Sequence, residues 1–215
     1  MLAKLGERIL DWIYPPRCIF CEQILPIYSE RHCCAICREH LPWTKEENGS
    51  DCLAPLAYEG MVQNALYRFK YGGHREYGKS FASLVIPYAK EHLTGLPIDL
   101  LIPVPLHPKR QKKRGYNQAE EIGKELAKKL GIPLETNVLS RIKNTPPQSK
   151  LSPRARQNNM KEAFSVVDFS KVKGKVILII DDIYTTGSTM EACKQELLHC
   201  GAKKVYLLTI SKAYG

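Results

Sequence analysis

The chain has 215 residues, of which 44% are hydrophobic and 25% charged, so it is long enough for one mid-sized domain with a buried core plus a small module. It carries 32 Lys and Arg residues against 22 Asp and Glu residues, and the net charge of +10 favours partners that bear phosphates. No apolar run approaches about 18 residues, so we expect no transmembrane helix. The amphipathic start, residues 1–13, lacks the features of a secretory signal, and we expect a cytoplasmic protein.

Six of the eight cysteines fall in the first quarter of the chain. Two C-x2-C pairs lie twelve residues apart, and four thiolates in this pattern suit a tetrahedral structural Zn2+. Metal binding would supply much of the folding energy of so short a segment. The predicted ligands are Cys18, Cys21, Cys34 and Cys37. The register stays open, since one ligand could be replaced by another nearby thiol or imidazole: Cys33, Cys52, His32 or His40.

A polar segment with a glycine, residues 45–51, is expected to be a linker between a zinc-binding module, residues 1–51, and a second domain, residues 52–215. In chain order, the elements predicted for the second domain are an edge strand at 53–58, helices at 61–69 and 77–93, a strand at 98–106, a helix from Asn117 to Gly131, strands at 137–142 and 162–167, a strand and helix between 176 and 200, and a strand at 203–210. Pro87 is expected to kink or break the second helix. Alternating strands and helices predict a doubly wound parallel sheet.

A strongly basic segment follows the strand at 98–106, where five of the six residues 109–114 are cationic. Cations track the phosphates of a single-stranded nucleic acid, and aromatic rings stack on its bases. The alternative is that these charges belong to a solvated loop. The candidate nucleic-acid contacts are Lys109, Arg110, Lys112, Lys113 and Tyr116.

A β-branched and Leu run, residues 176–180, predicts a buried parallel strand that stops at two carboxylates, Asp181 and Asp182. A polar loop follows, and the spacing of Ser188 and Glu191 predicts a capping box at the start of the next helix. Asp181 and Asp182 are acceptors that suit the vicinal hydroxyls of a ribose. The alternative is an ordinary strand-to-helix turn with two solvated aspartates.

The polar loop after the acids has the composition of a phosphate site. A glycine lets the backbone approach a ligand closely, the hydroxyls are donors, and the helix start presents unpaired N–H groups at a positive dipole end. The candidate loop residues are Thr185, Thr186, Gly187, Ser188 and Thr189.

The strand, acid pair and loop resemble the thirteen-residue motif of the phosphoribosyltransferase fold, which binds 5-phosphoribosyl-1-pyrophosphate. The whole chain resembles the ComF family of phosphoribosyltransferase-like competence proteins. That resemblance rests on the cysteine pairs, Ile-Pro-Val-Pro-Leu-His at 102–107, Arg-Gly-Tyr-Asn-Gln at 114–118, Thr145 with Gln148, Arg154 with Asn158, and the acidic loop. It implies a type I phosphoribosyltransferase-like sheet with a small N-terminal zinc module.

The resemblance also implies roles for individual residues. Asp181 and Asp182 would bind the ribose, the loop from Thr185 to Thr189 the 5-phosphate, and Mg2+ would bridge the pyrophosphate and ribose oxygens. Residues 145–158 would form a mobile hood. Arg114 is suited to stabilise the leaving pyrophosphate, which accumulates negative charge as the glycosidic bond breaks. The pyrophosphate loop would consist of Pro103, Val104, Pro105, Leu106 and His107.

The function implied by the resemblance is a role in natural competence, in which the protein handles incoming single-stranded DNA and carries a phosphoribosyl pyrophosphate site. Its implied partners are single-stranded DNA, a competence helicase and recombination-mediator proteins. The alternative is an active phosphoribosyltransferase, a glycosyltransferase unrelated to DNA, although the sequence shows no acceptor-binding signature. We therefore treat catalysis as an open question at this point.

Overall fold

The computed structural model describes residues 15–26, 33–44, 52–143 and 163–214. Three predicted segments lie outside these residues: the amphipathic start at 1–13, the linker at 45–51 and the hood at 145–158. Within the described ranges, no helix is long and apolar enough to cross a membrane.

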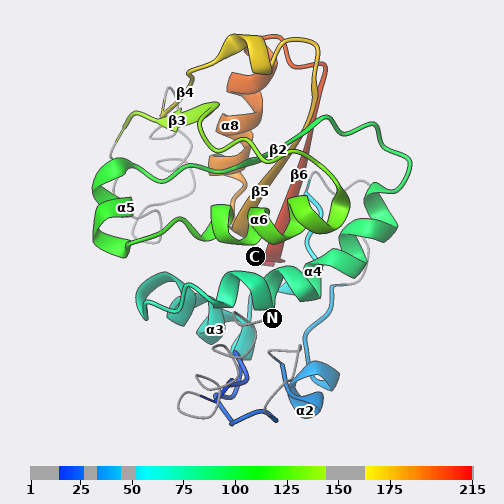
Figure 1. The fold of residues 1–215 in the computed structure, drawn as a ribbon, viewed down its shortest axis with the longest axis vertical. Helices are drawn as coiled ribbons and strands as arrows, with labels where there is room; N and C mark the ends of the chain where they lie inside the picture. Colours follow the sequence, from blue (N-terminus) through cyan, green and yellow to red (C-terminus); the bar gives the residue numbers. More distant parts are fainter. Residues whose placement is uncertain (1–14, 27–32, 45–51, 144–162, 215) are drawn as a thin grey trace, which may run out of the picture.

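A four-stranded parallel sheet forms the centre of the larger domain, in the order β1-β6-β5-β2 (Figure 1). Its strands are β1 (Leu56–Ala57), β2 (Leu100–Pro103), β5 (Val176–Tyr184) and β6 (Lys204–Lys212). The short strand β1 lies at one edge, as the neighbouring Pro55 predicts. The observed architecture is the predicted doubly wound α/β sheet.

Helices cover both faces of this sheet. On one face, α4 (Tyr77–Leu93) and α6 (Gln118–Leu130) pack with α3 (Gly60–Tyr71), and α8 (Ser188–His199) covers the other face. Successive side chains of a strand point to opposite faces. In β5, Leu178 and Ile180 therefore enter the core under α4 and α6, whereas Ile177 and Ile179 enter the core under α8.

Two predicted strands lie outside the parallel sheet. β3 (Leu139–Arg141) and β4 (Phe164–Val166) pair with each other as a separate antiparallel sheet, which packs against α8. The smaller elements are α2 (Ala35–Glu39) and a 3-10 helix (Phe169–Lys171).

Two local predictions around the end of β5 are wrong. β5 does not stop at the two carboxylates but continues to Tyr184, because β6 runs beside it and supplies backbone partners as far as Lys212. The capping box does not form, since Gly187 is the N-cap with a φ of 71° and Ser188 is already helical. Of the kink or break expected at Pro87, the break does not occur, because one helix runs from Tyr77 to Leu93; a kink stays a prediction.

The basic segment is a helix, α5 (Pro108–Arg114), and not a loop. The His107 ring nitrogen Nδ1 accepts a hydrogen bond from the Lys109 backbone N–H at 3.2 Å, and Pro108 occupies the first turn, where its missing N–H costs nothing. Gly115 ends the helix in the left-handed conformation, with a φ of 85°. Local caps thus hold a helix that would otherwise suffer from its clustered charges.

Candidate functional site

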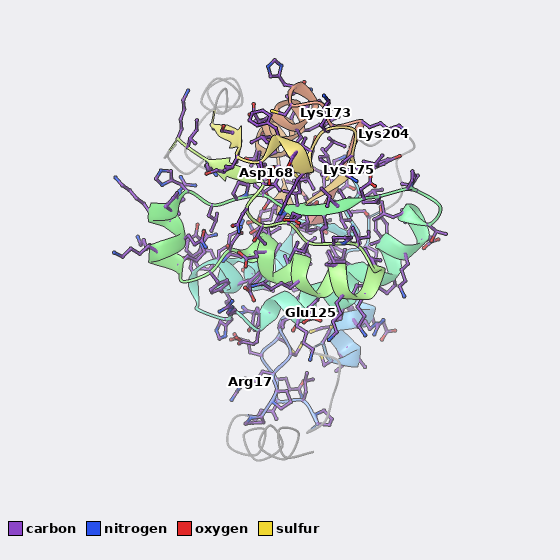
Figure 2. All side chains as sticks on the ribbon, turned by 45° about the horizontal axis from the view of Figure 1, so that its top comes forward. Arg17, Glu125, Asp168, Lys173, Lys175 and Lys204 are labelled. Carbon is purple, nitrogen blue, oxygen red and sulfur yellow. The ribbon has the colours of Figure 1, made fainter. Side chains whose placement is uncertain are left out.

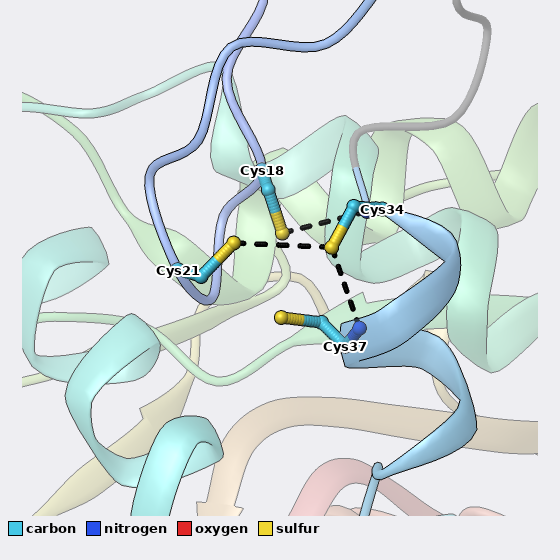
Figure 3. Close-up of side chains that lie close together, drawn as sticks. All are labelled: Cys18, Cys21, Cys34 and Cys37. Carbon is cyan, nitrogen blue, oxygen red and sulfur yellow. Dashed lines mark hydrogen bonds between the residues drawn. The ribbon is translucent and has the colours of Figure 1, made fainter.

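The four predicted zinc ligands form one cluster (Figure 3). Their four sulfur atoms all lie within 4.8 Å of one another, and the Cys21 and Cys34 sulfurs are 3.8 Å apart. In a tetrahedral site with Zn–S bonds of about 2.3 Å, neighbouring sulfurs lie about 3.8 Å apart. The donor set and its spacing therefore fit a structural Zn2+ held by Cys18, Cys21, Cys34 and Cys37.

Backbone N–H groups point at these sulfurs. The Cys34 N–H donates to the Cys18 sulfur at 3.4 Å, and the Cys37 N–H donates to the Cys34 sulfur, which caps α2, at 3.3 Å. Burial alone would raise the pKa of Cys18, but hydrogen bonds from backbone N–H groups outweigh it and lower that pKa to about 7. The cluster thus favours the thiolate form of Cys18, which is the form that ligates a metal.

The alternative ligands that the structure describes are not among the four clustered thiols, although Cys33 lies next to them. The Cys33 thiol donates to the Cys34 carbonyl at 3.4 Å, and burial raises its pKa to about 12. Cys52 is buried in the core under α8, beside the Thr209 hydroxyl. The His40 ring bonds the Ile36 carbonyl at 2.8 Å. The predicted register therefore stands; His32 lies outside the described residues.

A cleft of about 600 Å³ opens at the carboxyl ends of β2 and β5. Many of the predicted site residues line it, including Arg110, which the sequence analysis assigned to nucleic-acid binding: Val104, Pro105, Leu106, Arg110, Arg114, Asp181, Asp182, Thr185 and Thr189. Lining residues that the sequence analysis did not select as site residues are Tyr58, Tyr67, Lys70, Tyr71, Asn117, Gln118, Arg141 and Ile183. This is the position at which open α/β sheets bind ligands.

The two carboxylates point to opposite faces of β5. Asp182 continues the row of Leu178 on the α4 side and pairs with the Lys70 ammonium of α3 at 3.0 Å. Burial lowers the pKa of Lys70, but the two aspartates, Asp182 first, outweigh burial and raise it. The acid that should receive a ribose hydroxyl thus already holds a cation.

Asp181 faces the side of the sheet that α8 covers. Burial and the neighbouring Asp182 carboxylate raise the pKa of Asp181 to about 7, although Lys70 and Arg141 oppose this. Its Oδ1 accepts the Asp182 N–H at 2.8 Å. Near neutral pH the Asp181 carboxyl group can therefore donate or accept a hydrogen bond to a ligand hydroxyl.

The loop between β5 and α8 has a shape that only glycine permits at position 187. Gly187 has a φ of 71°, and an added Cβ would lie 2.6 Å from the Tyr184 ring carbon Cζ. The Thr186 and Ser188 hydroxyls are 2.8 Å apart. The turn brings Thr185 and Thr189 to the cleft and starts α8 there, so the positive end of the helix faces the same space.

Asn117 fixes the loop after β2. Its side-chain amide donates to the Val104 carbonyl at 3.0 Å, while its oxygen accepts the Ala119 N–H at 3.1 Å and caps α6. The Val104 N–H donates to the Ile180 carbonyl of β5 at 2.9 Å. His107, placed in this loop by the sequence analysis, caps α5 and does not line the cleft.

Cations surround the acids. Burial and the nearby Arg114 lower the pKa of Arg110, and burial followed by Arg110 lowers that of Arg141, which is 6% exposed. Like charges crowded in this way favour an anionic ligand. Among the described residues that line the cleft, four cations, Lys70, Arg110, Arg114 and Arg141, face two carboxylates, Asp181 and Asp182.

The predicted nucleic-acid contacts divide into three groups, and the first is Arg110, which is half-buried and lines the cleft. Lys109, Lys112 and Lys113 are exposed on α5. Tyr116 is only 6% exposed, its ring lies 5.7 Å from that of Phe69, and its hydroxyl donates to the Phe69 carbonyl. A ring buried in this way cannot stack on a base, so the prediction for Tyr116 is wrong.

Three of the residues that the sequence analysis missed share one face of α3. Tyr67, Lys70 and Tyr71 are spaced i, i+3 and i+4, which puts them side by side on a helix. That spacing was visible in the sequence, but the position of α3 beside β5 was not. The wall of the cleft that α3 forms therefore required the structure.

The parallel sheet, the acid pair followed by a glycine turn at a strand end, and the four-cysteine cluster define a phosphoribosyltransferase-type domain joined to a zinc module. Comparison with known families agrees: the phosphoribosyl transferase domain matches residues 117–213, and the double zinc ribbon domain matches residues 9–66. The chain belongs to the ComF family.

Three relatives illustrate this membership. The DNA utilization protein YhgH of Salmonella typhi is 32% identical over 167 residues, which cover 76% of this chain and 70% of the relative. Competence protein F of Haemophilus influenzae is 29% identical over 199 residues, 92% and 85% of the two chains. Competence protein ComFC of Bacillus subtilis is 27% identical over 176 residues, 78% and 68% of the two chains.

Among solved structures, the chain is similar to an adenine phosphoribosyltransferase, with a TM-score of 0.44 and 15% identity over 70% of this chain and 75% of the other.

Proposed function

We propose that this ComF-family protein binds phosphoribosyl pyrophosphate with Mg2+ in the cleft and acts on single-stranded DNA taken up during natural competence. One observation carries the first part: a single cleft joins the two carboxylates, the glycine turn and four cationic side chains, which come from five segments of the chain. The names of the relatives, competence proteins and DNA utilization proteins, support the second part.

The parts of the ligand fit different parts of the cleft. Thr185, Thr189 and the start of α8 offer donors to the 5-phosphate, and the acid pair offers partners to the ribose hydroxyls. The loop from Val104 to Leu106, with Arg110 and Arg114, receives the pyrophosphate. Mg2+ would neutralise charge on the pyrophosphate, and the carboxylates are the oxygen donors that this ion prefers.

Lys70 gives binding a specific requirement. Its 3.0 Å ion pair with Asp182 must loosen when a ribose hydroxyl approaches that carboxylate. The released ammonium then lies beside the ligand and is attracted to the ligand's phosphates. The cation thus stabilises the acid pair when the cleft holds no ligand and the anionic ligand when it does.

Calorimetry tests the phosphoribosyl pyrophosphate site. The native protein should bind this ligand in the presence of Mg2+, and the variant that combines Asp181→Asn with Asp182→Asn should lose at least about tenfold in affinity, the loss of one or two charge-assisted hydrogen bonds. Asp168→Asn is the control, because Asp168, labelled in Figure 2, loses the same charge and is not part of the cleft lining. Equal affinity in the double variant, or no binding by the native protein, would refute the site.

Salt dependence tests the DNA interaction. Replacing the exposed α5 lysines, Lys109, Lys112 and Lys113, with Gln should weaken binding to an oligonucleotide and reduce the log–log salt slope by about 2, since each phosphate contact on a single strand contributes about 0.7.

Three other exposed lysines provide a matched control for this experiment: Lys173, Lys203 and Lys204. They lie at the opposite end of the sheet, where β5 and β6 begin; Lys173 and Lys204 are labelled in Figure 2. Their replacement with Gln removes the same charge and should leave the slope nearly unchanged. If both triple variants lose the same slope, binding follows net charge alone and α5 is not the contact surface.

A further inference from the structure

We infer that Tyr67 and Tyr71 of α3 form a stacking platform for a nucleobase at the mouth of the cleft. Both rings line the cleft, and their centroids are 4.9 Å apart with the ring planes tilted by 50°, so a base would stack on one ring and touch the edge of the other. Each residue is 64% exposed. This inference rests on the proposed function, because it assigns the base-binding part of the same cleft.

The two tyrosines are not needed for the packing of α3. That helix buries Val62, Ala65, Leu66 and Phe69 on its inner face, and the tyrosines lie on another face. A single exposed aromatic residue on a soluble domain is ordinary. Two adjacent rings that border a charged cleft are the arrangement with which proteins hold a planar ligand.

The charges beside the rings indicate which kind of planar ligand fits. The Arg114 guanidinium lies 5.3 Å from the centroid of the Tyr71 ring, and Arg110 lines the same cleft. Lys70, between the two tyrosines in sequence, reaches inward to Asp182. An aromatic surface at the mouth and cations further in suit a molecule with a heterocyclic base at one end and phosphate at the other.

The platform should accept any of the common bases. Stacking uses the face of the base, which every base has, whereas discrimination needs donors and acceptors aimed at the base edge. The groups next to the tyrosine pair are guanidinium and ammonium cations, which suit phosphates. We therefore expect similar affinity for purines and pyrimidines apart from their different stacking strengths.

A base can reach this platform from two sources. A free base, the acceptor in a phosphoribosyl transfer, would bind together with phosphoribosyl pyrophosphate. A nucleotide of single-stranded DNA would bring its own phosphate and would compete with phosphoribosyl pyrophosphate for Lys70, Arg110 and Arg114. The two sources therefore differ in how they respond to that ligand.

Fluorescence of 2-aminopurine measures stacking directly, because the emission is quenched when this base stacks. The probes are free 2-aminopurine and a ten-residue oligothymidylate with one central 2-aminopurine, each titrated with the full-length, zinc-loaded protein. We expect quenching with at least one probe. Combining Tyr67→Ala with Tyr71→Ala should lower the affinity for that probe by about tenfold or more, as expected for the loss of aromatic stacking.

Two further variants separate stacking from folding. Combining Tyr67→Phe with Tyr71→Phe keeps both rings and should retain the quenching. Tyr214→Ala removes an exposed tyrosine that also lies near a cation, Lys212, at 5.7 Å, but is not part of the cleft lining, and it should behave like the native protein. If the Phe variant loses quenching as fully as the Ala variant, the rings do not act by stacking and the inference fails.

Each of the remaining outcomes overturns either the stacking platform or the proposed phosphoribosyl pyrophosphate site. Quenching that is equal in the native and Ala proteins overturns the platform. The platform is also overturned if the native protein is a dimer and the Ala variant is a monomer with unchanged quenching, because the two tyrosines would then form a contact between two copies of the chain. Absence of phosphoribosyl pyrophosphate binding, with quenching that depends on the tyrosines, overturns the proposed ligand site and leaves the platform standing.

Discussion

Replacing Asp181 with Asn should make the protein more stable at alkaline pH, although it should weaken the binding of phosphoribosyl pyrophosphate. Burial and the Asp182 carboxylate raise the pKa of Asp181 from 3.8 to about 7. The folded state therefore holds this proton more tightly than the unfolded chain does. The stabilisation from that proton is complete below about pH 4 and is lost as the pH rises through 7.

The size of the effect follows from the shift. A change from 3.8 to about 7 corresponds to about 4 kcal/mol at most. The carboxyl group borders the open cleft, and relaxation and water reduce the penalty, so we expect about 1–2 kcal/mol in favour of Asp181→Asn at pH 8.5. At pH 5 the native carboxyl group is still protonated but the unfolded chain is already ionised, so the difference should fall to less than half of its value at pH 8.5 and reach zero only below about pH 4.

Urea unfolding followed by circular dichroism, with Zn2+ present, measures this difference between pH 5 and pH 8.5. With a denaturant slope of about 2 kcal/mol/M, the unfolding midpoint of the variant should rise by about 0.5–1 M at pH 8.5. Asp182→Asn provides the contrast, because it leaves the largely buried Lys70 ammonium without its 3.0 Å partner and should destabilise the protein. A gain for Asp181→Asn that is equal at both pH values, or a loss at pH 8.5, would refute the reasoning.

Asp168→Asn is a second control with the opposite sign. Hydrogen bonds from Ser170 lower the pKa of Asp168, which is exposed. A lowered pKa gives stability that is present at neutral pH and is lost as the pH falls through that pKa. This variant should therefore show no gain at pH 8.5.

Three other predictions concern single residues. Gly187→Ala should lower the free energy of unfolding by about 1–2 kcal/mol through the left-handed backbone alone, and by more through the overlap with the Tyr184 ring. It should also weaken the binding of phosphoribosyl pyrophosphate. Urea unfolding measures the first effect and calorimetry the second. Cys21→Ser should reduce the zinc content below about one ion per chain and lower the melting temperature, whereas Cys33→Ser should keep both, as metal analysis and thermal unfolding will show. Arg68→Gln should lower the free energy of unfolding by about 1–3 kcal/mol, because the guanidinium donates to two carbonyls of the zinc-binding turn. The same variant should release zinc to a chelator faster than the native protein does.

The parts of the molecule that the sequence predicted best are those in which ligand chemistry requires particular residues at short spacing. The two C-x2-C pairs are such a case, since four thiolates must meet at one metal, and the structure brings them together. The turn after the acid pair was predicted only in part: a glycine turn starts the next helix, but the predicted capping box does not form, since Gly187 itself is the N-cap with a φ of 71°. Each of these patterns involves residues that lie close together in the sequence, or a local geometry that few other structures require.

The wrong predictions concern residues whose burial or secondary structure is determined by contacts with residues far away in the sequence. Tyr116 has an aromatic body and one polar atom, so it suits both a nucleic-acid surface and a core; a hydrogen-bond acceptor at Phe69, 47 residues away, makes the core stable. The strand through Asp181 and Asp182 continues because β6 is beside it, although carboxylates are unusual inside a strand. Neither partner is visible from the local sequence.

Helix α3 connects the two functional parts of the molecule. Arg68 donates to the Ile19 and Phe20 carbonyls, at 2.7 and 2.9 Å, between the first two zinc ligands. Two residues later, Lys70 pairs with Asp182 in the cleft. The Phe69 carbonyl accepts hydrogen bonds from the Tyr116 hydroxyl and from the side-chain amide of Gln118, the first residue of α6. Figure 1 shows the zinc module beside α3, on the side away from the sheet.

This arrangement explains why a metal site lies next to a phosphoribosyltransferase-type domain. A 12-residue helix at the rim of a cleft, with one exposed face, is held only by what it packs against. The zinc-binding turn supplies a second support through Arg68, opposite the support from the sheet. Since Lys70 and both cleft tyrosines are on this helix, we expect their positions to depend on the zinc module, and removal of the metal should disturb the cleft through α3.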